Sequence, residues 1–291
     1  MDQTMKTKTD WPITIAIVIF HLVAIIGLLM PTAPALVAFG ILYAVTVLGI
    51  TVGFHRYFVH RSFKTYPWVG NLFAVMGTLA LQGGLRSWVA HHRMHHAGSD
   101  TEKDPHNAKK GFWYSHVLWL FRSSPEFNSP KVVDRYSRDI SASPFLLFIS
   151  KGSVGALLQI VLGVVLLGFF GVEVMLWGIF VRLVAVYHVT WAVNSICHMW
   201  GYQNTKIEDL SQNNPIIGLL AFGEGWHNNH HAFADSARHG LRWFEVDLSW
   251  WVIRAMRGLN LAWDVKEVKL PVKSSESEGP SEMTVLTKSA V

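Results

Sequence analysis

The chain has 291 residues, of which 51% are hydrophobic and 15% charged, and its formal net charge is +5 at pH 7. Several uncharged runs reach the length of a membrane-spanning helix, which excludes an ordinary soluble domain. The single cysteine, Cys197, excludes an internal disulfide framework and a cysteine-rich metal site. The basic residues lie beside the apolar runs, which indicates control of membrane topology rather than nucleic-acid binding.

The first two apolar runs, residues 13–30 and 35–54, predict a helical hairpin. Lysines precede the first run and arginines follow the second, whereas the turn between the runs is uncharged. Because positive residues concentrate on the cytoplasmic side of a membrane, both outer ends of the hairpin are predicted to be cytoplasmic. Ala33-Pro34-Ala35 resembles a signal-peptide cleavage site, but cleavage there would leave a new terminus inside the second run.

Residues 67–85 are also apolar, but they contain Asn71, Gln82 and the pair Gly83-Gly84. If this stretch crossed the membrane, the histidine-rich segments before and after it would lie on opposite sides and could not share a metal centre. We therefore predict that it re-enters the membrane or lies at its interface.

Residues 144–170 and 174–200 predict a second hairpin, with Glu173 as the one charge in its turn. Arg182 lies inside the last run, where a charge is costly, and both a functional and a structural role are open for it. The fold class is therefore an all-α membrane protein with four transmembrane helices in two hairpins. The polar segments 55–143 and 201–264 predict a cytosolic helical cap that holds a histidine-bound pair of metals.

We expect residues 1–264 to form a single domain. Residues 265–291 are rich in Ser, Glu and Lys and lack aromatic residues, so they predict a disordered tail.

Three histidine clusters, within residues 55–60, 91–96 and 227–231, carry the candidate chemistry. The second and third contain the pattern H-x2-H-H, whose spacing places three imidazoles on one face of a helix. His55 and His60 lie about 140° apart on an ideal α-helix. We therefore predict that the helix ends between them and that both rings turn inward. His198 follows Asn194 by one turn and is a further candidate, whereas His91 has no counterpart and is not expected to bind metal.

Imidazole is a neutral ligand that suits iron, zinc, copper and nickel, and this number of rings predicts two metals. The outer N–H of a metal-binding imidazole needs an acceptor. Five nearby acids are candidates: Asp100, Asp104, Glu208, Asp209 and Glu224. A metal pair bound by nitrogen at a membrane surface suits redox chemistry on a lipid-borne substrate. Soluble di-iron bundles instead use additional carboxylates and a pair of Glu-x-x-His motifs, whereas this sequence contains that pattern once, at Glu224–His227.

The three clusters, H-x4-H and twice H-x2-H-H, resemble the histidine boxes of the integral-membrane fatty acid desaturases. Short sequence motifs around the clusters also resemble those of this family, at residues 53–57, 104–107, 111–113, 115–116, 194–198 and 223–231. They resemble the delta-9 (stearoyl-type) branch, and residues 77–84 are most similar to its bacterial and cyanobacterial acyl-lipid members. The resemblance covers about residues 12–265.

The resemblance implies two iron ions, with O2 as co-substrate, that remove two hydrogens from carbons 9 and 10 of a saturated acyl chain. It also implies that the depth of a kinked tunnel sets the position of the double bond. Carried over by motif, Asn194 would act through a water, and the iron ligands would be His55, His60, His92, His95, His96, His198, His227, His230 and His231.

Two departures from the pattern of the family bear on the acyl carrier and on the electron donor. Animal acyl-CoA enzymes carry Arg-Asp where this chain has Ala90-His91, which favours a lipid-bound acyl chain over acyl-CoA without excluding either. The His-Pro-Gly-Gly motif of a fused cytochrome b5 domain is absent, so a separate ferredoxin or cytochrome with its reductase is the expected electron donor. The expected location is a bacterial plasma membrane, with both termini and the histidine boxes in the cytoplasm.

Two other functions are weighed against a desaturase. A related membrane hydroxylase or monooxygenase of fatty acids or alkanes uses similar boxes and differs in its product. A metal transporter or sensor would hold polar ligands near the bilayer midplane, whereas these clusters lie at helix ends on one side.

Overall fold

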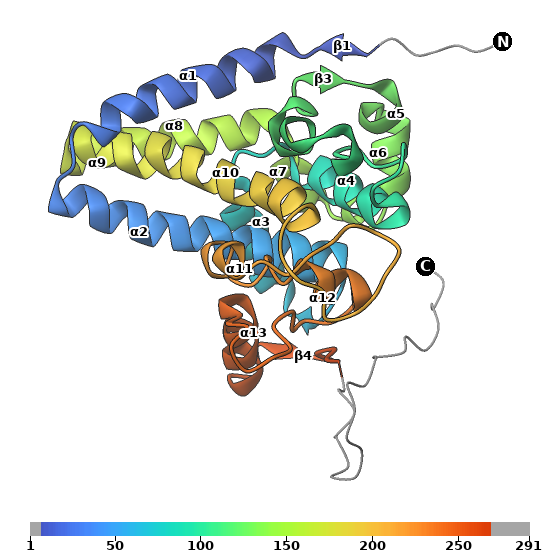
Figure 1. The fold of residues 1–291 in the computed structure, drawn as a ribbon. Coiled ribbons are helices and arrows are strands. Elements are labelled where there is room, and N and C mark those ends of the chain that lie inside the picture. The colour runs from blue at the N-terminus through green and yellow to red at the C-terminus, as the bar shows by residue number, and fades with distance from the viewer. Residues whose placement is uncertain (1–6, 269–291) are drawn as a thin grey trace.

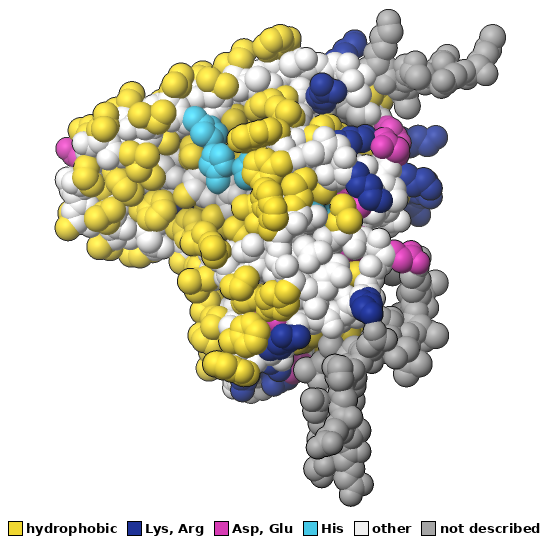
Figure 2. Space-filling model, viewed as in Figure 1, with side chains coloured by type: hydrophobic (Ala, Val, Ile, Leu, Met, Phe, Trp, Pro, Cys, Tyr) yellow, Lys and Arg dark blue, Asp and Glu magenta, His cyan; other side chains and the backbone are white. Residues whose placement is uncertain are grey.

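The computed structural model describes residues 7–268 and is mostly helical (Figure 1). Within these residues, four helical stretches are long and apolar enough to cross a membrane: Trp11–Leu28, Ala33–Val59, Gly152–Phe170 and Val172–His198. The long helices extend together to one side and the short helices form a cap at the other end (Figure 1). Hydrophobic side chains cover the long helices, and most visible Lys and Arg side chains lie on the cap (Figure 2). This arrangement confirms the predicted all-α membrane fold.

Local capping explains where the first hairpin begins and turns. The Asp10 carboxylate accepts a hydrogen bond from the Ile13 N–H at the start of α1 (Trp11–Leu28). The Thr32 hydroxyl does the same for the Ala35 N–H at the start of α2 (Ala33–Leu48). The second span then continues as an eleven-residue π-helix, η1 (Gly49–Val59).

The second helix ends at Val59, between His55 and His60 as expected, but its last eleven residues form a π-helix and not an α-helix. The His60 N–H donates to the carbonyl of His55 at 3.1 Å, which is a bond between residues five apart. A helix closed by such bonds is wider than an α-helix and brings residues five apart close to one face. The two imidazole centroids lie 4.8 Å apart as a result.

The second hairpin begins later than expected. Residues 144–170 are divided into α7 (Pro144–Ile149) and α8 (Gly152–Phe170), because Lys151 has extended backbone with ψ 128°. After a turn at Gly171, the last span consists of α9 (Val172–Leu176), a π-helix η5 (Trp177–Val181) and α10 (Arg182–Ser195), and it ends in a 3-10 turn (Ile196–His198).

Arg182 has a structural role in this bundle. Its fully buried guanidinium donates to the side chains of Thr46 and Gln159 and to the carbonyls of Gly178 and Leu79, at 2.7–3.0 Å. It therefore joins both hairpins to the cap.

The cap contains α3 (Pro67–Thr78) and α4 (Leu85–Gly98). The twelve residues of α3 span about 18 Å, which is too short to cross a membrane. This helix packs closely on η1, since a Cβ on Gly49 would lie 2.3 Å from the backbone of Met76 and Gly77. The other cap helices are short: α5 (Pro125–Asn128), α6 (Pro130–Tyr136), α11 (Pro215–Leu220), α12 (His227–Ala232), α13 (Leu248–Gly258), a π-helix η3 (Tyr114–Leu118) and the 3-10 turns Ala108–Lys110 and Ile140–Ala142.

Two short antiparallel strand pairs complete the cap. They are β1 (Lys8–Thr9) with β3 (Arg122–Ser123), and β2 (Lys64–Thr65) with β4 (Ala262–Trp263). The folded chain passes residue 264, because the Lys266 N–H donates to the Ser62 carbonyl and the Lys266 carbonyl accepts from the Ala237 N–H, both at 2.8 Å. Residues 269–291 of the expected tail lie outside the described residues.

Asp139 links separate parts of the cap and gives a test of its stability. Its carboxylate accepts hydrogen bonds from Arg61 at 2.8 Å and from Arg93 at 2.7 and 3.0 Å. Burial opposes its ionisation, but the two guanidinium groups outweigh burial and lower the pKa of Asp139 to about 2. After allowance for solvent screening, Asp139→Asn is expected to cost roughly 1 kcal/mol of stability at pH 7. The stabilisation is present above pH 4 and is lost as the pH falls through about 2, because the folded-state pKa lies below the unfolded one.

Thermal unfolding of the purified protein between pH 7 and pH 2 measures this effect. The melting temperatures of wild type and variant should differ at pH 7 and converge at pH 2. Asp264→Asn serves as the control, because Asp264 pairs with Lys64 at 2.8 Å while both side chains are more than 60% exposed. Equal melting temperatures for wild type and Asp139→Asn at pH 7 would contradict the prediction.

Candidate metal centre

Nine imidazoles converge where the cap meets the long helices. Within the described residues they form two groups whose ring nitrogens lie within 4.8 Å of one another. The first group is His55, His60, His92, His96 and His230, and the second is His95, His198, His227 and His231. These are the nine histidines that the sequence motifs single out, and they come from η1 and its end, α4, the end of the last span and α12.

Each H-x2-H-H box is divided between the two groups. In α4, His92 and His96 belong to the first group, whereas His95 belongs to the second. In α12 one histidine, His230, belongs to the first group, whereas His227 and His231 belong to the second. A single box therefore does not supply a single metal site, and each of these helices contributes to both groups.

Facing nitrogens within each group are spaced as ligands of one metal would be. The Nε2–Nε2 distances are 3.1 Å for His55–His230, 2.9 Å for His96–His230, 3.0 Å for His92–His96, 3.2 Å for His95–His231 and 3.0 Å for His198–His227. Two nitrogens bound at right angles, each about 2.1 Å from one ion, lie about 3 Å apart. Among the described residues, the buried Nε2 of His60 has no hydrogen-bond partner, so it too is available to a metal.

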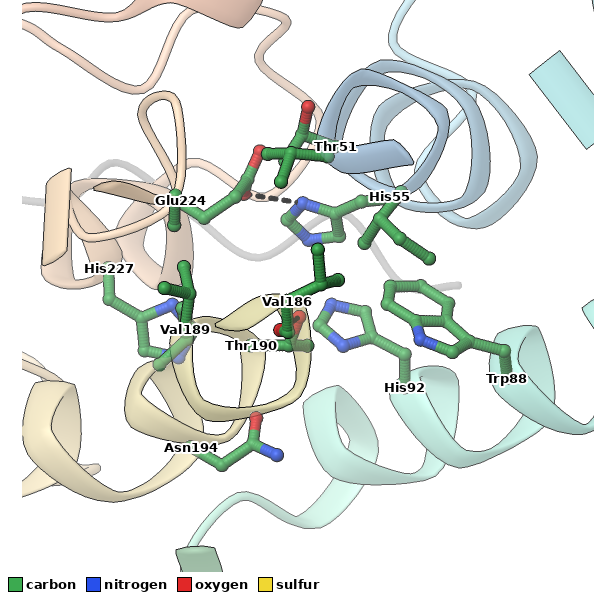
Figure 3. Close-up of a pocket in the computed structure, with 14 residues that line it drawn as sticks. Thr51, His55, Trp88, His92, Val186, Val189, Thr190, Asn194, Glu224 and His227 are labelled. Atoms are coloured by element: carbon green, nitrogen blue, oxygen red, sulfur yellow. Dashed lines mark hydrogen bonds and ion pairs between the residues drawn. The ribbon is translucent and has the colours of Figure 1, made fainter. Parts of the chain in front are cut away.

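Four carboxylates orient these rings from behind. Asp104 accepts from His95 Nδ1 at 2.9 Å, Asp100 from His198 Nδ1 at 3.0 Å and Asp209 from His231 Nδ1 at 2.8 Å. Glu224 Oε2 lies 2.6 Å from His55 Nδ1 (Figure 3). A proton on Nδ1 leaves the Nε2 lone pair free to face the metal. Four of the five predicted acids thus contact candidate ligands, and Glu208 instead lies exposed on the surface.

Burial sets the charge state of the centre. It lowers the pKa of His92, His96 and His230 well below the usual value, and neighbouring imidazoles lower it further. Burial opposes ionisation of Asp104 and Asp209, but contacts with nearby histidines outweigh it and hold the pKa of each carboxyl below its usual range. At pH 7 these three rings are therefore neutral, which is the form of imidazole that binds metal.

Three buried side chains around the centre were not predicted from the sequence. His239 Nδ1 lies 3.2 Å from Glu224 Oε2, and His106 Nδ1 lies 3.5 Å from Asp104 Oδ1. Arg56, which is fully buried, donates to both Glu224 and Asp247. The position of Arg56 directly after a candidate ligand was a usable signal, whereas nothing in the spacing of His239 marked it.

Of the two remaining candidate positions, Asn194 and His91, the histidine lies outside both nitrogen groups. Asn194 is on α10, one turn after Thr190, and lines a cavity beside His92 and His227 (Figure 3). His91 Nε2 instead lies 2.9 Å from Asn128 Oδ1.

Two neighbouring spaces adjoin the centre. A narrow cavity runs past His55, His92 and His227 and is otherwise lined mainly by apolar side chains, namely Val47, Ile50, Val186, Val189, Val193 and Ala221 (Figure 3). A larger cleft of about 1220 Å³ shares Trp88, His92, Thr190 and Asn194 with it and extends to α1. The arrangement can hold a long apolar chain against a metal pair.

Comparison with known proteins agrees with this geometry. The chain is 44% identical over 278 residues to the sn-1 stearoyl-lipid 9-desaturase of Synechocystis sp., covering 94% of this chain and 85% of that protein. It is 44% identical over 265 residues to the sn-1 stearoyl-lipid 9-desaturase of Anabaena variabilis, covering 90% and 95%. It is also 44% identical over 233 residues to the chloroplastic palmitoyl-monogalactosyldiacylglycerol delta-7 desaturase of Arabidopsis thaliana, covering 79% and 61%. The sequence model of the fatty acid desaturase family matches residues 31–265, and the chain belongs to that family.

Proposed function

We propose that this protein introduces a cis double bond at carbon 9 of a saturated acyl chain carried by a membrane glycerolipid. The observation that carries the proposal is the position of two nitrogen groups beside an apolar cavity, which shares lining residues with a larger cleft between the long helices. The names of the Synechocystis and Anabaena relatives give the carrier and the position. The Arabidopsis relative of equal identity is named for carbon 7, so the position is the point to measure.

We assign one iron ion to each nitrogen group, with Asn194 acting through a water. When bound, iron would activate O2, which with two electrons and two protons would take two hydrogens from the acyl chain and leave as two waters. The side chains of the protein orient the ligands and the substrate. The carboxylates hold the imidazoles, and the valines of the narrow cavity position the acyl chain and exclude water.

The cap is the proposed docking side for a separate electron donor, either a ferredoxin or a cytochrome with its reductase. The charge pattern around the first hairpin supports a cytoplasmic cap in a bacterial plasma membrane. We propose that the catalytic domain is the predicted one, residues 1–264, extended to Lys266 by the two backbone hydrogen bonds of that residue.

Fatty-acid analysis of a bacterial host that makes the protein tests the proposal. Mass spectrometry should locate a new double bond at carbon 9 in glycerolipid acyl chains, and His95→Ala should abolish it because one imidazole of the second group is lost. Hydroxylated chains would instead identify a hydroxylase. Unchanged lipids, with ferredoxin and its reductase supplied and the protein loaded with iron, would contradict the proposal.

A further inference from the structure

The half of α1 nearer the cap stands away from the other long helices. The two buried residues of α1, Ala24 and Gly27, both lie in the half farther from the cap. There the packing is tight, since a Cβ on Gly27 would lie 2.9 Å from the Val181 side chain. Figure 1 shows α1 diverging from α8 and α10 toward the cap.

Contacts at three points fix α1 in this divergent position. At the cap, β1 pairs with β3, and the Asp10 N–H donates to the Phe121 carbonyl at 2.9 Å. Midway along the helix, His21 Nε2 lies 3.0 Å from His188 Nε2 on α10. The other nitrogen of His188 lies 3.0 Å from His116 Nε2 on η3, which anchors this tie to the cap. The third point is the packing around Gly27. The gap is therefore built into the fold and does not depend on a loosely held helix.

The space behind the gap is the larger cleft. Its lining includes Ala16 and Phe20 of α1, Tyr187 and Trp191 of α10, and Gly152 and Ala156 of α8. On α8, Ala156 is exposed, and a Cβ on Gly152 would meet no atom within 4 Å among the described residues. The cleft is thus open beside α8, within the membrane-spanning layer, and its inner end reaches His92 and Asn194.

The charges at the cap end of the cleft are mixed. Among the described residues, its lining contains three carboxylates, those of Asp10, Glu102 and Glu126, against the cations Lys110 and Arg122. Lys110 is already paired with Glu102 at 2.7 Å. Such a rim offers little excess positive charge for a polyanionic carrier such as a nucleotide.

We infer that the gap between α1 and α8 is a side window through which the acyl chain of an intact membrane glycerolipid reaches the metal centre. This inference rests on the proposed function and adds the route of the substrate. An acyl chain that is still part of a bilayer lipid would have to pass through water to enter from the cap, which is costly for every CH2 group exposed. An opening at membrane depth removes that barrier.

Tryptophan substitutions that fill the window test this route. Ala16→Trp narrows it from α1 and Ala156→Trp from α8. The matched controls are Ile15→Trp and Leu157→Trp, because these neighbouring side chains are 53% and 55% exposed and lie outside the lining of the cleft. Gly152→Phe is a third block, since its added side chain starts in open space and does not disturb the packing of the helix.

The full-length proteins would be placed in vesicles of phosphatidylcholine that carries a photoreactive diazirine midway along one acyl chain. Peptide mass spectrometry then measures labelling of the α10 face around Thr190 and Asn194. In the window variants this labelling should fall at least about tenfold, because a filled gap cannot admit the chain without displacing the helices. The controls should label as the wild type does. Wild-type labelling of α10 in folded window variants would overturn the inference.

Labelling requires neither electrons nor O2, so it separates the window from the proposed reaction. Loss of labelling in the window variants, with wild-type protein that forms no double bond, would support the window and remove the proposed function. Desaturation of vesicle lipid by the window variants at the rate of the controls would remove the window and leave the proposed function intact.

Discussion

Replacing His198 with alanine is expected to reduce bound iron from about two ions per chain to about one and to abolish desaturation. The second nitrogen group would retain three imidazoles, whereas the five of the first group would be untouched. The variant also leaves the Asp100 carboxylate without the Nδ1–H donor that lies 3.0 Å away. The loss of activity should exceed the 10- to 100-fold reduction that is typical when a contact supporting a ligand is removed. Iron analysis of the purified protein, together with chromatography of the lipid products, measures both effects.

A substitution in the other group provides the reciprocal test. His60→Ala should also leave about one ion, since the buried Nε2 of His60 belongs to the first group. His188→Leu is the control for iron content, because His188 lies outside both groups and should retain both ions. Two ions bound to His198→Ala, or equal loss of iron from His188→Leu, would contradict the assignment of the metals to these groups.

Arg56→Met is expected to lower the free energy of unfolding by roughly 3–5 kcal/mol, because it removes one member of a buried ionic network. The Arg56 side chain is 0% exposed and lies 3.1 Å from Glu224 and 3.0 Å from Asp247. Without the guanidinium, two buried carboxylates lose their countercharge. Glu224 also orients His55, so the variant should bind less metal in the first group as well as unfold earlier.

Chemical denaturation in detergent, with iron analysis of the same samples, measures this prediction. Arg257→Met is the matched control, because Arg257 pairs with Glu267 at 2.7 Å while its side chain is 47% exposed. The control should change stability by less than about 0.5 kcal/mol, as is usual for a solvated ion pair. Equal stability of the two variants would show that the buried network contributes no more than a surface pair.

The sequence by itself determined the features that depend on local pattern. Apolar runs of sufficient length identified the membrane-spanning segments, because a helix must match the thickness of the bilayer whatever surrounds it. The i, i+3, i+4 spacing identified the histidines of α4 and α12, because side-chain direction along a helix is fixed by its geometry. The acids Asp100, Asp104, Asp209 and Glu224 were found because buried imidazoles need acceptors close by.

The tertiary structure decided how these parts are combined. The π-helix that brings His60 beside His55 depends on wider hydrogen bonding that an i, i+3, i+4 pattern does not reveal. The division of each box between two groups follows from α4 and α12 each contributing rings to both groups. Arg56 and His239 both contact Glu224, although Arg56 lies far from it in the chain and His239 lies on the other side of α12 in the sequence. The cleft beside α1 is likewise lined by residues from distant parts of the chain. Such contacts depend on how whole helices pack together, and a local sequence pattern contains no information about that packing.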